Sequence, residues 1–356
     1  MSDDTTISEA TITTTSEHPT FATTDPSAEE AITTTTTTAS ETLSADSLSK
    51  YQSSIQSLSS IIPSIPSSSL SSSSSNPALS LLHHRQTASQ ISSLLRQPDS
   101  GAGDNNLCRW LYDTFQSGDP SLQLVVLRFI PIISGVYLSR VPLRKPLAGF
   151  EAVLLALYAH ETTSRAGQPI TVNVPDLSHP SLYHESIAPT KNNATALNLA
   201  VISPSLEPHG TVRSTRRARI VGVALELYYS RIYQMPSGSK IEFCEFCRVW
   251  AGQDGDNKKE EGRIPLPWEL LQPMLRILGH CLMGSSCRRK EDSREVLEAA
   301  IGACKCLHTR SMHDINAKAI LATGSLLRLG KMVLEANDDH ALNDPTEISM
   351  SNVISI

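Results

Sequence analysis

The sequence predicts an all-α fold, an irregular helical bundle or a solenoid-like stack of antiparallel helices, with a small extended insertion near residues 170–203. Apolar residues recur three, four and seven positions apart over most of the chain after residue 78. Between Gly167 and Gly210, six prolines exclude a long helix. There Ile170, Val172 and Val174 alternate with polar residues, and residues 197–201 alternate similarly. We therefore expect a β-hairpin on a helical body.

The expected helices follow one another with short connections. Pro131 should kink the most apolar helix, and Pro273 is tolerated only if it lies in the first turn of its helix. A polar loop is expected at 252–262. The helices are expected near residues 79–95, 107–116, 122–138, from 146 onward, 215–235, 241–250, 268–282 and 315–333. The last one carries an apolar face of Ile315, Ala319, Ala322, Leu326, Leu329 and Val333.

Composition divides the chain into three parts. Of the first 75 residues, 38 are Ser or Thr, nine are acidic and only Lys50 is basic. Such a stretch cannot bury enough apolar surface to fold. We expect a disordered acidic tail over 1–77, a helical domain over 78–337 and a flexible acidic tail over 338–356.

Charge and targeting signals exclude several classes of protein. The first 75 residues carry a net charge of −8, so the remaining residues must carry about +2 to give the net charge of −6 of the whole chain. A domain so close to neutral argues against nucleic-acid binding driven by phosphate attraction. The start of the chain shows no secretory signal and no myristoylation glycine, which predicts a cytosolic protein. The apolar stretch 122–138 contains Arg128 and Pro131, so we interpret it as a buried helix and expect no transmembrane segment.

Strings that resemble catalytic motifs fail on spacing. Residues 324–331 read GSLLRLGK, but the glycines are one residue too far apart for a phosphate loop, and Met332 replaces the magnesium-binding hydroxyl. His160-Glu161 lacks the second histidine of a zinc protease, because Arg165 and Ser164 occupy its place. The sequence therefore predicts a non-enzymatic protein without catalytic residues or a cofactor.

The cysteines leave one alternative open. Cys244 and Cys247 form a C-x-x-C pair, for which Cys281, Cys287, Cys304 and Cys306 are possible partners in a zinc site. The pair is i and i+3 on an apolar helix, where a buried cysteine commonly acts as a small hydrophobe. We favour the packing role, and a small zinc- or thiol-dependent protein remains the alternative.

Two basic clusters are candidates for contact with anionic lipid or an acidic partner. The denser one comprises Arg213, Arg216, Arg217 and Arg219, and residues 288–290 form the second. The simpler interpretation is a solvated helix end. Positive charge at a helix N-terminus is mildly unfavourable, which invites an acidic neighbour.

Four segments in this order resemble the hyccin family. They are LQLVVLRFIPIISGVYL (122–138), EAVLLALYAHE (151–161), ITVNVPDLSHPSLYHES (170–186) and YQMPS (233–237). The resemblance covers roughly Leu79 to Ala336. Its most distinctive string is polar and aromatic, in a non-helical region, and includes Pro180, Ser181, Tyr183, His184 and Glu185. We expect these residues to fix the extended segment or to contact a partner.

The resemblance implies a non-catalytic adaptor. Hyccins belong to the plasma-membrane complex of phosphatidylinositol 4-kinase type III alpha. In that complex they bind a tetratricopeptide-repeat scaffold protein, which links the kinase to a lipid-anchored membrane protein. The implied role is stabilisation of the scaffold and support of phosphatidylinositol 4-phosphate synthesis. The implied location is the cytoplasm and, through partners, the cytosolic face of the plasma membrane.

Overall fold

The fold is taken from a computed structural model, which describes residues 45–63, 76–175, 197–207, 216–254, 257–258, 264–283 and 290–342. All of them fall in one compact unit, Leu43–Ile356. The helices are α1 Ala45–Ile61, α3 Pro77–His83, α4 Arg85–Arg96, α5 Asn106–Gln116, α6 Pro120–Leu127, α7 Ile130–Arg140, α8 Ala148–Ser164, α9 Arg217–Ser230, α10 Ser237–Ala251, α11 Trp268–Leu282, α12 Lys290–His313 and α13 Ala317–Leu342, with 3-10 turns η1 Val141–Leu143 and η3 Ile232–Gln234. The predicted helical fold class is confirmed.

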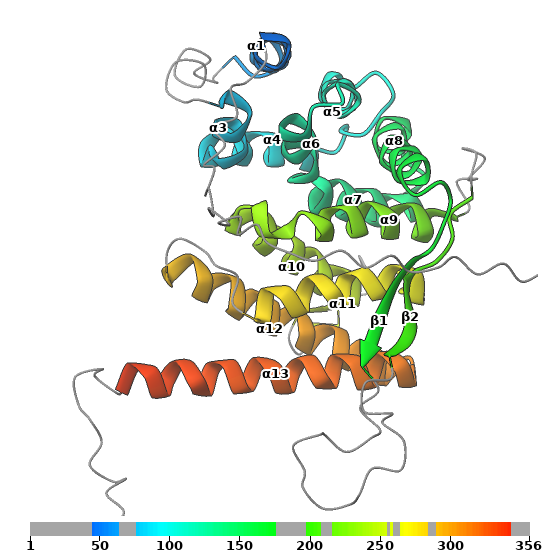
Figure 1. Ribbon diagram of the computed structural model, residues 1–356, viewed down its shortest axis with the longest axis vertical. Coiled ribbons are helices and arrows are strands. Elements are labelled where there is room, and N and C mark those ends of the chain that lie inside the picture. Colours follow the sequence, from blue (N-terminus) through cyan, green and yellow to red (C-terminus); the bar gives the residue numbers. More distant parts are fainter. Residues whose placement is uncertain are drawn as a thin grey trace, which may run out of the picture. The chain divides into compact units, whose positions relative to one another are not determined.

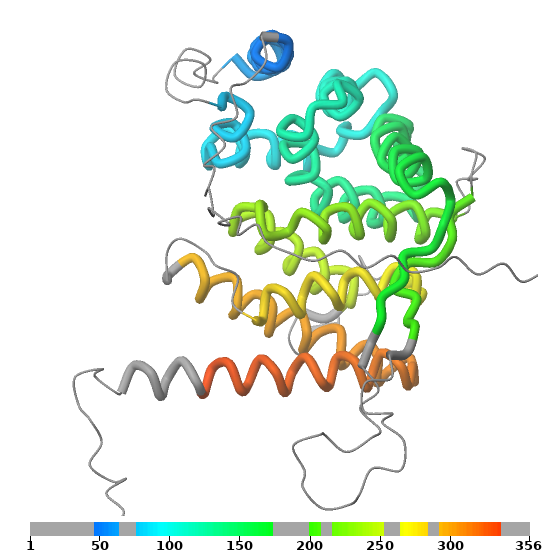
Figure 2. The backbone as a smooth tube through the Cα atoms, viewed as in Figure 1, coloured from blue at the N-terminus to red at the C-terminus, as the bar shows by residue number. Residues whose placement is uncertain are grey.

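Most of the helices stack in two files that follow chain order (Figures 1 and 2). One file is α8, α9, α11 and α13, each packed on the next. The other is α4, α7, α10, α12 and α13. The files are joined because α7 contacts α9 and α11 contacts both α10 and α12. A continuous hydrophobic core fills the space between them.

The most apolar segment forms two helices, α6 and α7, rather than one kinked helix. They are bent by 43° relative to each other, and Pro131 lies in the first turn of α7, where a missing N–H costs nothing. Nearly all their apolar side chains are buried. In the described part of the chain, no single helix is long and apolar enough to span a membrane, although this bent pair together with η1 meets the length and composition for one.

The predicted hairpin is confirmed as an antiparallel ribbon of β1 (Ile170–Pro175) and β2 (Leu197–Ser203), with a register shift between Ile170 and Thr171. It follows α8 directly. In the expected loop after α10, β3 (Gln253–Asp254) and β4 (Asn257–Lys258) form a second, minimal pair.

Two helices contradict the sequence-based expectations. The expectation that residues 1–77 form no core is wrong for residues 45–62, because α1 buries Tyr51, Ile55 and Leu58 against the body. Most of the remaining residues up to 75 lie outside the described chain. Helix α12 was not expected at all, although it lies between α10 and α13 and buries Val296 and Leu307.

Two residues also differ from their predicted placement. Ile315 does not lie on the face of the last helix, because α13 begins at Ala317 and Ile315 occupies the preceding turn, 86% exposed. Pro273 lies beyond the first turn of α11 and is buried inside the helix. It has no N–H to donate to the carbonyl of Glu269, four residues earlier.

Gly222 of α9 packs against that carbonyl. A Cβ atom at Gly222 would lie 2.5 Å from the Glu269 oxygen. A side chain here would therefore push α9 and α11 apart. Glycine permits the close approach of two backbones at the place where proline has interrupted the hydrogen-bond ladder of α11.

We predict that Gly222→Ala lowers the free energy of unfolding by about 1–3 kcal/mol, because the new methyl group overpacks the α9–α11 contact. The matched control is Gly238→Ala in α10, where an added Cβ meets no atom within 4 Å. That variant should be neutral or more stable by up to about 1 kcal/mol, since alanine favours the helix. Urea denaturation monitored by circular dichroism measures both, and equal effects would contradict the proposed contact.

Candidate protein-binding surface

The β1–β2 ribbon is fastened to the helical stack at its base. The hydroxyl of Ser203 donates to the Glu226 carboxylate of α9, and the side-chain amide of Gln272 in α11 donates to the Ile202 carbonyl at 2.9 Å. The Leu206 N–H donates to the Gly167 carbonyl at 3.0 Å, which closes the base after α8. These contacts fix the base of the ribbon to α9 and α11. Figure 1 shows the ribbon running past the end of α11 toward α13.

One face of the ribbon presents apolar side chains to solvent. Thr171 pairs with Val201 and Asn173 with Leu199, so these four side chains share a face. Leu199 is 69% exposed and Val201 is 56% exposed. On the other face, Ala200 and Ile202 are partly buried. The exposed face is therefore the one turned away from the body.

Exposed apolar side chains are also found on α11 and α13. Trp268, at the start of α11, lies one helical turn from Gln272, which holds the ribbon, and is 38% exposed. The Lys318 ammonium of α13 lies 5.9 Å from the centroid of its ring. Leu321 follows Lys318 by three residues and is 73% exposed. We call Leu199, Val201, Trp268, Ile315 and Leu321 the apolar edge.

Ile315 is the most unusual member of the apolar edge. Its φ is 51°, in the left-handed region that β-branched residues avoid. The Asn316 N–H donates to the Ser311 carbonyl at 3.0 Å, so Ile315 lies in the turn that ends α12, where glycine or asparagine is usual. An exposed isoleucine in this conformation costs stability and gains no burial. Such strain on a surface makes Ile315 a candidate for contact with another molecule.

The arginine cluster is paired with acids within the chain. Glu207 forms ion pairs with Arg216 and, at 3.7 Å, with Arg219. Arg217 Nε lies 3.9 Å from Glu151 Oε1. The acidic neighbours expected at a helix N-terminus are therefore present. Arg213 lies outside the described residues.

Arg217 also donates from Nε to the Tyr137 hydroxyl at 3.0 Å, and that hydroxyl donates to Glu151 Oε1 at 3.0 Å. Burial raises the pKa of Tyr137, so the phenol stays neutral and can act as both donor and acceptor. The network links α7, α8 and α9. Arg217 thus has a structural task that leaves it less available for lipid than an unpaired surface arginine would be.

The family-like string with Pro180, Ser181, Tyr183, His184 and Glu185 lies outside the described residues, between the two strands of the ribbon in sequence. Its role stays a prediction. The second basic cluster is also outside them, apart from the backbone of Lys290.

The cysteine pair lies in the core. Cys244 and Cys247 are fully buried on α10, and Cys281 of α11 and Cys304 of α12 are buried near them. A hydrogen bond with Cys281, together with burial, raises the pKa of Cys244 well above its usual value. Burial raises the pKa of Cys247 well above its usual value and that of Cys304 to about 12. Cys244, Cys247 and Cys304 are therefore thiols at neutral pH, whereas zinc ligation and thiol chemistry use the thiolate.

Metal binding gains no geometric support from the part of the chain that the structure describes. There, no group of three or more His, Cys, Asp or Glu side chains is placed so that it could hold a metal ion. Cysteines 244, 247, 281 and 304 instead fill the contact between three helices as small apolar side chains.

We predict that Cys244 and Cys247 react with iodoacetamide at pH 8 only as fast as the domain opens, because their raised pKa values leave little thiolate. Cys306 is partly exposed on α12 and should be modified at least tenfold faster, so it serves as the internal control. Mass spectrometry of timed samples measures both rates. Fast labelling of Cys244 and Cys247, or stoichiometric zinc in the purified protein, would instead support a thiol-dependent or zinc-dependent protein.

Comparison with known families adds one finding to this geometry. The hyccin family model matches residues 72–353, which include every described element from α3 to α13. The match covers more than three quarters of the 356-residue chain. Helix α1 lies before it. The chain belongs to the hyccin family.

Proposed function

We propose that this protein is a non-catalytic adaptor that binds and stabilises a tetratricopeptide-repeat scaffold, and so supports phosphatidylinositol 4-kinase type III alpha at the plasma membrane. The observation that carries the proposal is the hyccin match over residues 72–353. Membership of this family supports an adaptor role in the kinase complex generally. In this proposal the adaptor contacts a lipid-anchored membrane protein only indirectly, through the scaffold. The complex thereby supports phosphatidylinositol 4-phosphate synthesis.

The apolar edge is the surface that we assign to the scaffold. A repeat scaffold presents grooves between helices, and isolated exposed apolar side chains on a partner can insert into such grooves. Leu199, Ile315 and Leu321 are each more than two thirds exposed. They come from strand β2, the turn before α13 and α13 itself, so a partner that covers them would also hold the ribbon against the stack.

The first test is co-expression of the full chain with a tetratricopeptide-repeat scaffold of a phosphatidylinositol 4-kinase complex. We expect the two to co-purify and the thermal midpoint of the adaptor to rise, since a partner that binds only the native state stabilises it. A chain that is monodisperse alone, and neither co-purifies with the scaffold nor gains stability from it, would refute the adaptor role.

A second test locates the surface. Leu199→Asp should weaken scaffold binding at least tenfold, about 1.4 kcal/mol, because it places a carboxylate in an apolar contact. The control is Leu143→Asp in η1, where leucine is 64% exposed, so the same change is made at similar exposure. Isothermal titration or surface plasmon resonance measures both. Equal losses, or none for Leu199→Asp, would move the interface away from the apolar edge.

Ile315→Gly separates binding from folding. Glycine tolerates a φ of 51°, so the variant should be about 1 kcal/mol more stable to urea than the natural chain. It also removes an exposed side chain from the apolar edge, so its affinity for the scaffold should fall. A variant that is stabilised and binds normally would show that Ile315 has no part in the interface.

A further inference from the structure

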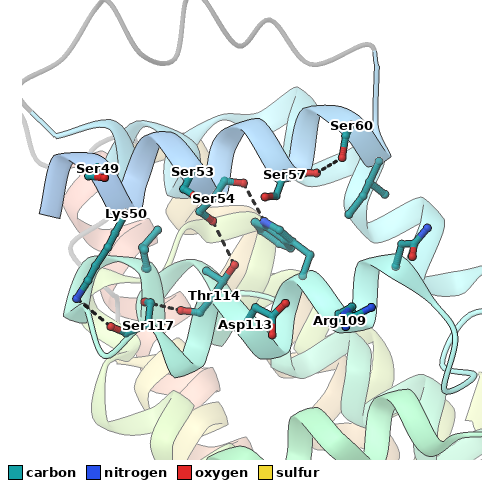
Figure 3. Close-up of a pocket in the computed structure, with 14 residues that line it drawn as sticks. Ser49, Lys50, Ser53, Ser54, Ser57, Ser60, Arg109, Asp113, Thr114 and Ser117 are labelled. Atoms are coloured by element: carbon teal, nitrogen blue, oxygen red, sulfur yellow. Dashed lines mark hydrogen bonds between the residues drawn. The ribbon is translucent and has the colours of Figure 1, made fainter. Parts of the chain in front are cut away.

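The first helix of the stack has a polar outer face. Helix α1 packs on α5 and α3, and Figure 3 shows its Ser54 facing Thr114 of α5, with the two hydroxyls 3.1 Å apart. Its exposed residues are mostly serine and glutamine. Leu48 is its most exposed large apolar side chain, at 37%. A polar outer face of this kind is what allows a helix to end a stack in water.

Helix α13 lies at the other end of the stack, where both files of helices finish (Figure 1). One of its faces packs on α11 and α12 and buries Ala319, Thr323 and Gly330. The contact is close, because a Cβ atom added at Gly330 would lie 3.0 Å from the Ile301 side chain of α12. The opposite face of α13 points away from the stack.

This outward face carries a stripe of exposed side chains at helical spacing. We call Leu321, Ser325, Arg328 and Met332 the outer stripe. They are four, three and four residues apart, so they lie on one side of α13, and all four are exposed. Leu321 is 73% exposed and Met332 is 60% exposed. The outer face of α13 thus holds two large apolar side chains where α1 holds polar ones, and its spacing is that of a seam between two packed helices.

The charges on and beside the outer stripe are mainly positive. Arg328 belongs to it, and Lys318 and Lys331 are exposed beside it. Between residues 317 and 335 these three cations are accompanied by one acidic residue, Glu335, which lies 3.6 Å from the Lys331 ammonium. The Lys318 ammonium lies over the Trp268 ring. A partner that fits this face must therefore supply apolar side chains together with acidic ones.

We propose that the outer stripe binds a helix of the scaffold, which continues the stack beyond α13 and presents apolar side chains flanked by aspartate or glutamate. The inference rests on the adaptor role proposed above and names the part of the scaffold that docks. A helical-repeat protein stacks each helix against its neighbours, so a helix at its surface can add to a second stack in the same way. Leu321 belongs to both the outer stripe and the apolar edge, which makes the two surfaces continuous.

The pattern favours a helix over an anionic membrane. Leu321 and Met332 are eleven residues apart, about 16 Å along the helix axis, and Ser325 and Arg328 lie between them on the stripe. A helix that lies in a membrane interface inserts a broad, continuous apolar face. The broad apolar face of α13 is turned inward, onto α11 and α12. Two separate apolar side chains suit the gaps between the side chains of a facing helix.

The experiment measures the affinity of the full chain for a tetratricopeptide-repeat scaffold of a phosphatidylinositol 4-kinase complex by surface plasmon resonance, at low and at high salt. Met332→Asp should weaken binding on the order of tenfold at both, because it places a carboxylate in an apolar contact. Arg328→Glu should weaken binding on the order of tenfold at low salt and less at high salt, because salt screens its repulsion of the acidic helix.

The matched control is Arg109→Glu, which makes the same change of charge at an exposed position of α5, near the α1 end of the stack (Figure 3). Its affinity for the scaffold should equal that of the natural chain. Circular dichroism should show equal thermal midpoints for all three variants, since each substituted side chain is exposed. A loss of affinity in the stripe variants is then a loss of contact rather than of folding.

Four outcomes would overturn the inference, and they differ in what they say of the adaptor role. Normal binding by Met332→Asp and Arg328→Glu would remove the outer stripe from the interface and leave the adaptor role intact. No binding by the natural chain would refute both. Equal losses for Arg109→Glu would show a dependence on net charge alone. Stripe variants that keep the scaffold but no longer bind vesicles of phosphatidylserine and phosphatidylcholine would assign this face to the membrane.

Discussion

The fold depends on two buried arginines that hold the ends of α7. Arg128, just before α7, donates to the Leu82 carbonyl near the end of α3, and Arg140, in its last turn, donates to the carbonyls of Arg96 and Gln97 at the end of α4. Both residues are less than 9% exposed. Each cation thus lies against the negative end of a helix, which offsets part of its desolvation cost. Burial lowers the pKa of Arg128 to about 10, so it remains charged at neutral pH.

The position of α7 determines the rest of the stack. Gly135 of α7 leaves space for the Phe246 ring of α10, since a Cβ at Gly135 would lie 2.1 Å from that ring. The Ser239 hydroxyl of α10 donates to the Arg128 carbonyl at 2.6 Å. Helix α12 packs against α10, and α13 packs against α12. Part of the apolar edge lies on the last of these helices, so its position depends on contacts that lie far from it in sequence.

Sequence periodicity predicted the elements with strong apolar faces and missed those with weak ones. The amphipathic spacing of α11 and the alternation in the ribbon were sufficient to place both. Helix α12 begins with charged residues, and half of its buried apolar residues are alanine or cysteine, such as Ala300 and Cys304, so its hydrophobic pattern is weak. In α1 the spacing of Tyr51, Ile55 and Leu58 is helical, but a surrounding excess of serine hid it.

The candidate surface could not be predicted from the sequence, for a different reason. Ile315 continues the spacing of the last helix, and only the backbone conformation reveals that it lies in a turn with its side chain in solvent. Exposure of Leu199 depends on which ribbon face meets α11, which the Gln272 hydrogen bond decides. By contrast, the acidic partners of Arg216 and Arg217 followed from helix-dipole reasoning, because that effect is local.

Helix α1 and the apolar edge are separated along the stack. Helix α1 contacts α3 and α5, whereas the edge belongs to the ribbon, α11 and α13, and the main contacts that connect the two pass from α7 to α9 or α10, or from α8 to α9. Helix α1 therefore does not cover the edge. Any effect on scaffold binding would have to pass through a shift of α7 or α8, and α7 is fixed at both ends by buried arginines. A change at α1 should accordingly leave the affinity of the edge for its partner unchanged.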